Sequence, residues 1–161
     1  MRKPNRAALL VTLPLAGALA LAGCDSANST VSQARSAATS AVASARAAVD
    51  QARSKLSDVQ KDSSDAQSKL DSVSGSAKTN ASKAVSDAKD AAAQASAALD
   101  RAKQNAAGAK DDLASARSKV QTAKSEVQQA ATEVSGAAAS ALDALAQGLQ
   151  KLSDALNQAG S

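Results

Sequence analysis

The chain has 161 residues with 19 basic and 15 acidic side chains, no histidine, no aromatic residue and one cysteine. A single cysteine excludes an internal disulfide framework, and the lack of histidine removes the usual proton shuttle near neutral pH. Without aromatic side chains there are no stacking platforms for nucleic acid, and Val and Leu are too few to fill a thick globular core.

The N-terminal segment has the pattern of a secretory signal peptide. A basic head with Arg2, Lys3 and Arg6 precedes an apolar stretch over residues 7–22. That stretch contains Pro14 and is shorter than the roughly 20 residues that a transmembrane helix needs. We therefore expect residues 1–23 to be cleaved. Because three basic residues lie in this segment, 16 basic and 15 acidic residues remain from Cys24 onward.

The apolar stretch ends in Leu21-Ala22-Gly23-Cys24, which contains the only cysteine of the chain. This motif resembles the lipobox of bacterial lipoproteins at all four positions. The resemblance implies that a signal peptidase recognises Leu21, Ala22 and Gly23, and that the Cys24 thiolate is the lipidation site. The mature protein would then be anchored through its lipid, palmitate included, on the extracytoplasmic side of the cell membrane. The structural alternative for Cys24 is a spare thiol or a small buried side chain.

Residues 24–30 are expected to form a lipidated tether, followed by a first helix over residues 31–73. A T-x-x-Q capping box at Thr30–Gln33 marks its start. Apolar residues recur there with the heptad period of a coiled coil, with Ser63 as a polar exception. The two columns are Val42, Val49, Leu56 and Leu70, and Val31, Ala38, Ala45, Ala52, Val59, Ala66 and Val73.

A turn near residues 74–80 is expected next, because Gly75 suits the end of a helix and Asn80 suits an N-cap. A second helix then follows over residues 81–135. Its heptad columns keep step across Gly108, which predicts a glycine tolerated inside one continuous helix. They are Val85, Ala92, Leu99, Ala106, Leu113, Val120, Val127 and Val134, and the alanines at every seventh position from Ala81 to Ala137.

A third helix is expected over residues 141–158, opened by a capping-box-like pair, Ser140 and Asp143. It differs from the others in having a leucine face, formed by Leu142, Leu145, Leu149, Leu152 and Leu156. Its polar face is not basic, which favours packing on another helix or self-association over binding to a membrane surface.

Together these elements predict an all-α fold. Residues 31–135 would form an alanine-rich antiparallel coiled-coil hairpin, with the leucine-faced helix 141–158 near its membrane-proximal end. A single extended helix and partial disorder remain open alternatives. The mature part resembles alanine-rich envelope lipoproteins of the murein lipoprotein kind, which are tied to peptidoglycan through a C-terminal lysine. This chain ends in Ala159-Gly160-Ser161 instead. Its composition is also similar to late-embryogenesis-abundant proteins, but its period is seven residues rather than eleven.

No residue constellation predicts catalysis, a cofactor or a small-molecule substrate. Asp62 and Asp65, at i and i+3 of a helix, could hold a divalent cation weakly, but are more typical of a solvated face. Five cations at one heptad position allow two interpretations: a binding surface for anionic wall polymers or lipid head groups, or coiled-coil flanking charges that set partner choice. These are Lys89, Lys103, Lys110, Arg117 and Lys124.

The sequence thus predicts a non-catalytic, lipid-anchored protein of the bacterial cell envelope that acts as a structural spacer or helical interaction rod. The alternative is a lipid-tethered binding or stress-protective module for wall polymer or a protein partner, partly disordered when free. The expected partners are the membrane, through the lipid on Cys24, and a second copy or another envelope protein. Nucleic acid is not expected.

Overall fold

The computed structural model describes residues 26–104 and 107–161, with side chains from residue 31 onward. The described chain is helical, as predicted. Its elements are α1 (Ser26–Lys69), a short 3-10 helix η1 (Leu70–Ser72), α2 (Gly75–Lys103), α3 (Ala109–Glu133) and α4 (Gly136–Gly160). The chain divides into two compact units, Met1–Ser36 and Ala37–Ser161, and the packing described below lies within the second.

The first reversal of direction occurs at Val73 and Ser74, which are both extended, and Gly75, which has a φ of 73°. The turn predicted over residues 74–80 is therefore shorter than expected, and Asn80 lies inside α2 rather than at its N-cap. A left-handed backbone is easily adopted by glycine because it has no Cβ. The helix can thus restart at Gly75 itself.

The expected continuous helix over residues 81–135 is wrong. α2 ends at Lys103, and α3 begins at Ala109 after Gly108, whose φ of 79° is left-handed. The heptad period continues past Gly108 because each helix of a bundle needs its own apolar stripe. The period therefore does not show whether the chain folds back between two stripes. Ala106, assigned to one column, lies outside the described residues.

The third reversal repeats the first. Val134 and Ser135 are extended and Gly136 has a φ of 63°, so the same Val-Ser-Gly sequence joins α1 to α2 and α3 to α4. α4 consequently begins five residues before the helix predicted over 141–158. Ser140 is not its cap; the Ser140 hydroxyl donates to the Gly136 carbonyl oxygen within the helix, at 3.3 Å.

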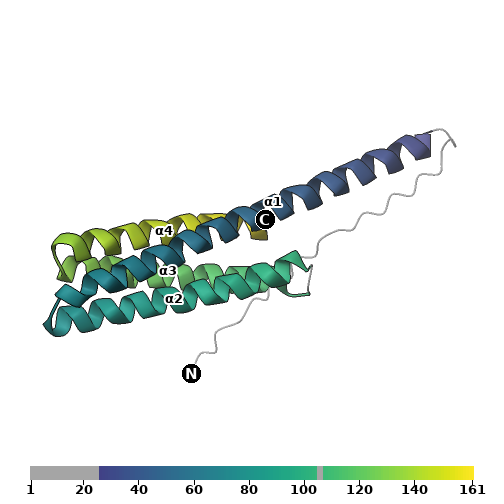
Figure 1. Ribbon diagram of the computed structural model, residues 1–161. Coiled ribbons are helices and arrows are strands. Elements are labelled where there is room, and N and C mark those ends of the chain that lie inside the picture. The colour runs from purple at the N-terminus through teal and green to yellow at the C-terminus, as the bar shows by residue number, and fades with distance from the viewer. Residues whose placement is uncertain (1–25, 105–106) are drawn as a thin grey trace, which may run out of the picture. The chain divides into compact units, whose positions relative to one another are not determined.

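The helices of the second unit form an antiparallel four-helix bundle (Figure 1). The cross-helix contacts define the order. Arg53 of α1 pairs with Asp100 of α2. Arg101 of α2 pairs with Asp112 of α3 at 2.7 Å. Helix α3 packs extensively against both α2 and α4, whereas α2 and α4 have few contacts with each other. The predicted antiparallel hairpin is present as α1 and α2, and α3 with α4 forms a second hairpin against it.

Alanine dominates the core of α2 and contributes to the other helices, whereas α4 supplies more buried leucines than any other helix. Five leucines of α4 are at most 1% exposed: Leu142, Leu145, Leu149, Leu152 and Leu156. Full burial of a leucine contributes about 1.5–3 kcal/mol, far more than burial of an alanine. α4 is therefore the main source of apolar burial per residue, and its leucine face packs inside the bundle rather than standing beside a hairpin.

The N-terminal part of α1 within this unit is exposed. Side chains of residues 37–47 are solvent-accessible, and Val42 is 48% exposed although it continues the heptad column of Val49 and Leu56. Burial of that column begins at Val49. Residues 26–30, expected as part of the tether, belong to α1, so the Thr30–Gln33 capping box does not mark the start of the helix.

Candidate functional site

The predicted lipidation motif lies outside the described residues. Leu21, Ala22, Gly23 and Cys24 all precede Ser26, the first residue of α1. The same holds for residues 1–23, the predicted signal peptide. Lipidation at Cys24, the site with the strongest sequence support, therefore stays a prediction. Other candidate surfaces lie within the described residues.

Three of the five cations singled out in the sequence reach from α3 to α4. The Arg117 guanidinium donates to Asn157 Oδ1 at 2.8 Å, and the Lys124 ammonium donates to Gln150 Oε1 at 2.7 Å. Lys110 donates to the main-chain oxygen of Ser161 at 3.4 Å. We call Lys110, Arg117 and Lys124 the α3 cation row. The acceptors of Arg117 and Lys124 are neutral amide oxygens, so these two bonds position the cations without neutralising them.

The other two predicted members of that column, Lys89 and Lys103, lie on α2 instead. The break at residues 104–108 separates them from α3, because the chain turns back there. The predicted five-residue row is thus reduced to three residues. Its pairing with α4 agrees with the interpretation as flanking positions of a helix seam.

The α2–α3 groove differs in that it contains an ion pair. Arg101 pairs with Asp112, and Asn80 donates to Glu133 Oε2 at 2.7 Å. Asp112 also lies in the first turn of α3, where the helix dipole favours a negative charge. Asp112 is therefore compensated by Arg101, whereas the Glu133 carboxylate is held by a neutral amide.

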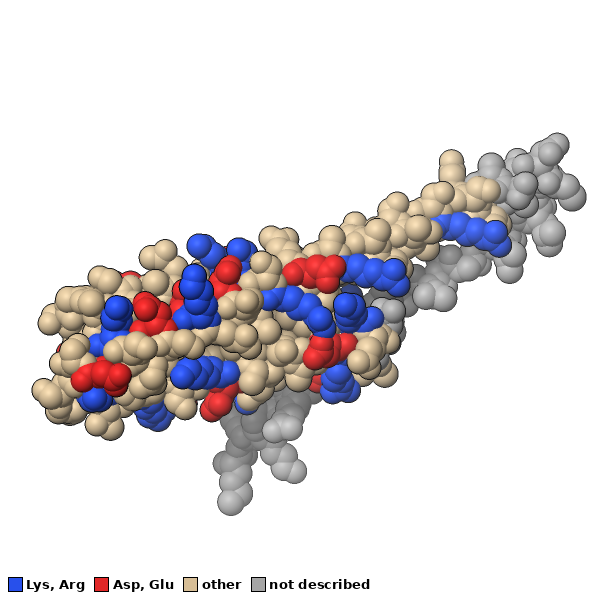
Figure 2. Space-filling model, viewed as in Figure 1, with Lys and Arg blue, Asp and Glu red and all other residues tan. Residues whose placement is uncertain are grey.

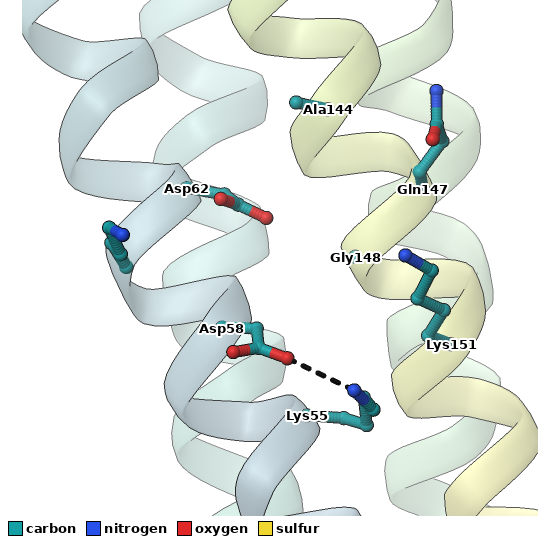
Figure 3. A pocket seen from close by; sticks show the side chains of 8 residues that line it. Lys55, Asp58, Asp62, Ala144, Gln147, Gly148 and Lys151 are labelled. Carbon is teal, nitrogen blue, oxygen red and sulfur yellow. Dashed lines mark hydrogen bonds and ion pairs between the residues drawn. The ribbon is translucent and has the colours of Figure 1, made fainter.

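A polar cavity of about 270 Å³ opens between α1 and α4 (Figure 3). Its lining includes three lysines, Lys55, Lys61 and Lys151, together with Asp58 and Asp62. Lys55 pairs with Asp58 at 3.2 Å. The close-up shows Lys151 of α4 and Asp62 of α1 on opposite sides of the opening.

Asp62 lies against the backbone of α4 at Gly148. A Cβ added to Gly148 would be 2.9 Å from Asp62 Oδ2 and 3.4 Å from Val59 Cγ2, so the two helices meet here at close range. Partial burial raises the pKa of Asp62 above its usual 3.8, with Asp58 adding to the effect. The sequence does not reveal this contact, because a glycine inside a helix does not indicate which helix it faces.

The described residues contain no group of three or more His, Cys, Asp or Glu side chains placed to hold a metal ion. Asp62 and Asp65, which the sequence suggested as a weak site for a divalent cation, lie on the same stretch of α1. Only Asp62 lines the cavity. Among the helices described, none combines the length and apolarity required to cross a membrane.

Comparison with protein families, curated proteins and solved structures finds no match to this chain. Any functional conclusion therefore depends on the chain's own residues.

Proposed function

We propose that this protein is a non-catalytic lipoprotein of the bacterial cell envelope, anchored through Cys24, whose helical bundle acts as a spacer or interaction module on the extracytoplasmic side of the membrane. The observation that carries the proposal is the position of the only cysteine. It follows a basic and then apolar leader, directly after Leu21-Ala22-Gly23.

The beginning of α1 bears on how a lipid on Cys24 would be joined to the bundle. Ser26 is helical, so two residues after the proposed lipid the chain enters a helix of 44 residues. A lipid on Cys24 would consequently be linked to helical structure through a very short segment. A single acyl chain gives only marginal membrane binding, so the several chains of a bacterial lipoprotein suit stable anchoring.

Metabolic labelling with radioactive palmitate, followed by membrane fractionation, tests the anchor. The native chain should incorporate label and sediment with membranes, and Cys24→Ser should lose both properties because the acyl-accepting thiolate is gone. Ser26→Ala, two residues away, keeps the thiol and should label normally. Undiminished labelling of Cys24→Ser would refute the proposal.

A binding role is favoured by the exposed part of α1. Residues 37–47 continue the heptad pattern of the buried seam, and Val42 is half exposed. Such a stripe suits contact with another helix, such as that of a second copy. Sedimentation velocity at increasing protein concentration should reveal self-association that Val42→Ser weakens. A concentration-independent monomer would leave the spacer role alone.

A further inference from the structure

Helix α1 is much longer than the helices that pack against it. It has 44 residues, whereas α2, α3 and α4 have 29, 25 and 25. Within the second unit, every residue from 37 to 47 is exposed, and the first buried side chain of α1 is that of Val49. The bundle therefore leaves residues 37–48 uncovered on the face that it covers further along the helix.

Three side chains of this segment form what we call the α1 stripe: Ala38, Val42 and Ala45. They continue the two heptad columns that are buried at Val49 and Ala52. Because the α-helix turns by 100° per residue, all five lie on one face of α1. Val42 is nevertheless 48% exposed, whereas Val49 is 5% exposed. The stripe is thus continuous with a packed helix interface and has the same kinds of side chain.

Charged side chains are scarce in this part of α1. Residues 37–48 contain one, Arg46, whereas residues 49–69 contain eight. Figure 2 shows basic and acidic side chains interspersed over the bundle, and mostly uncharged ones along the N-terminal part of α1. Depletion of charge is typical of the core of a protein–protein interface, whereas a helix face that stays in water is normally polar or charged. The segment therefore has the composition of a contact surface.

The chemistry of the stripe favours another helix as its partner. A polyanion or an anionic membrane surface would require clustered cations, and insertion among lipids would require large apolar side chains. Residues 37–48 have one cation and no apolar side chain larger than valine. A stripe of small side chains permits close approach by a helix whose facing side chains are also small. The same stripe on a second copy meets this requirement, as a twofold contact uses one surface twice.

We propose that the α1 stripe packs antiparallel against the α1 stripe of a second copy of this chain. The inference rests on the interaction role proposed above, and it specifies the partner and the direction of the contact. The bundle decides the direction. From Val49 onward it covers the seam face of α1, with Arg53 paired to Asp100 of α2 and Val59 close to Gly148 of α4. A parallel partner helix would run into this space, whereas an antiparallel pair directs the two bundles to opposite ends.

The first test measures self-association of the full chain carrying Cys24→Ser, so that no acyl chain contributes. Sedimentation equilibrium should be followed up to about 1 mM protein, because a contact of this size is expected to be weak. The mass should rise from that of a monomer toward that of a dimer. A monomer over the whole concentration range would overturn the proposal.

Two double variants test which face of α1 makes the contact. Ala38→Glu with Ala45→Glu should raise the dissociation constant at least about tenfold, because the dimer would enclose four carboxylates. The control Ser40→Glu with Ala47→Glu has the same spacing and added charge on the opposite face of the helix, and should change it less than about twofold. Circular dichroism checks that both variants stay helical. Equal weakening by the two pairs would overturn the role of the stripe.

Spin labels on chains with an intact stripe test the direction. Cys24→Ser removes the only cysteine, so Ser44→Cys or Gln60→Cys supplies a unique attachment site. In an antiparallel pair centred near Ala43, the two labels at residue 44 should lie within about 30 Å, and those at residue 60 about 50 Å or more apart. Short distances at both positions would show a parallel pair, and long distances at both would place the contact elsewhere. Either result would overturn the proposal.

Palmitate labelling separates this inference from the proposed anchor. A native chain that incorporates palmitate, together with a Cys24→Ser chain that stays monomeric, would reject the pairing and leave the anchor intact. Pairing of the Cys24→Ser chain through the stripe would support this inference even if the native chain incorporated no label.

Discussion

Ser63 is a polar residue in the core of the bundle. It occupies a heptad position between Leu56 and Leu70, its side chain is fully buried, and its hydroxyl has no hydrogen-bond partner. A buried hydroxyl without a partner costs about 1–3 kcal/mol. The sequence identified Ser63 as an exception in the seam, but only the packing shows that its hydroxyl is unsatisfied.

Ser63→Ala should therefore stabilise the protein by about 1 kcal/mol, since it removes the unsatisfied hydroxyl and leaves almost no cavity. Thermal unfolding followed by circular dichroism measures the change. Ser64→Ala is the control, because the exposed Ser64 hydroxyl already donates to the Gln60 carbonyl oxygen at 3.0 Å. A larger gain from Ser64→Ala would contradict the interpretation.

Asp62 should make stability depend on pH. Its pKa in the folded protein is raised by partial burial, by Asp58 and by Asp65, and is lowered by Lys61 and by Lys151 of α4. The folded state thus binds this proton more readily than the unfolded chain. Asp62 therefore disfavours folding when pH is above its folded pKa, and this penalty disappears as pH falls below 3.8.

Asp62→Asn should accordingly raise the melting temperature at pH 7 and give no gain below about pH 3.8, the usual value for an aspartate. Melting curves from pH 3 to pH 7 test this dependence. Asp65→Asn controls for the loss of one carboxylate outside the cavity. A gain from Asp62→Asn that is constant across the pH range would exclude ionisation of Asp62 as its cause.

The contact between α1 and α4 depends on one glycine. Gly148 is buried, and its missing Cβ permits the approach of Asp62 and Val59. Gly148→Val should lower stability by about 1–3 kcal/mol, because the added atoms would overpack the contact. Ala144→Val, one turn earlier on an exposed position of α4, introduces the same side chain. Chemical denaturation should show a much smaller loss for Ala144→Val, and equal losses would argue against close packing at Gly148.

The connection between α2 and α3 is decided by Gly108. Its φ of 79° is left-handed and nothing lies within 4 Å of a built Cβ, so alanine there would be strained by the backbone alone. Gly108→Ala should lower stability by about 1–2 kcal/mol. In the continuous helix expected from the heptads, the same change would raise stability by about 1 kcal/mol. The sign of the change in melting temperature therefore distinguishes a turn from a helix interior.

At the scale of the whole molecule, the order of the helices can be measured with two spin labels. Asn80 donates to Glu133 at 2.7 Å across the α2–α3 groove, although the two are 53 positions apart. Labels at these sites should give a distance below about 25 Å, whereas one continuous helix would separate them by about 80 Å. Labels at Asn80, in the second turn of α2, and at Gln104, its C-cap, should lie about 36 Å apart in either arrangement. A long distance between residues 80 and 133 would refute the bundle.

The sequence by itself determined the helical class, the apolar stripes and the leucine face of the last helix, because these follow from composition and a local period. It placed one reversal near Gly75 but did not reveal the reversal at Gly108. A heptad stripe looks the same whether the next helix continues or folds back, so Gly108 was read as a helix residue. The repeated Val-Ser-Gly sequence at residues 73–75 and 134–136 was the available signal for two similar turns. Only the tertiary structure decided which side chains meet across the helices, since the partners of the α3 cation row lie 26 to 51 positions away in sequence.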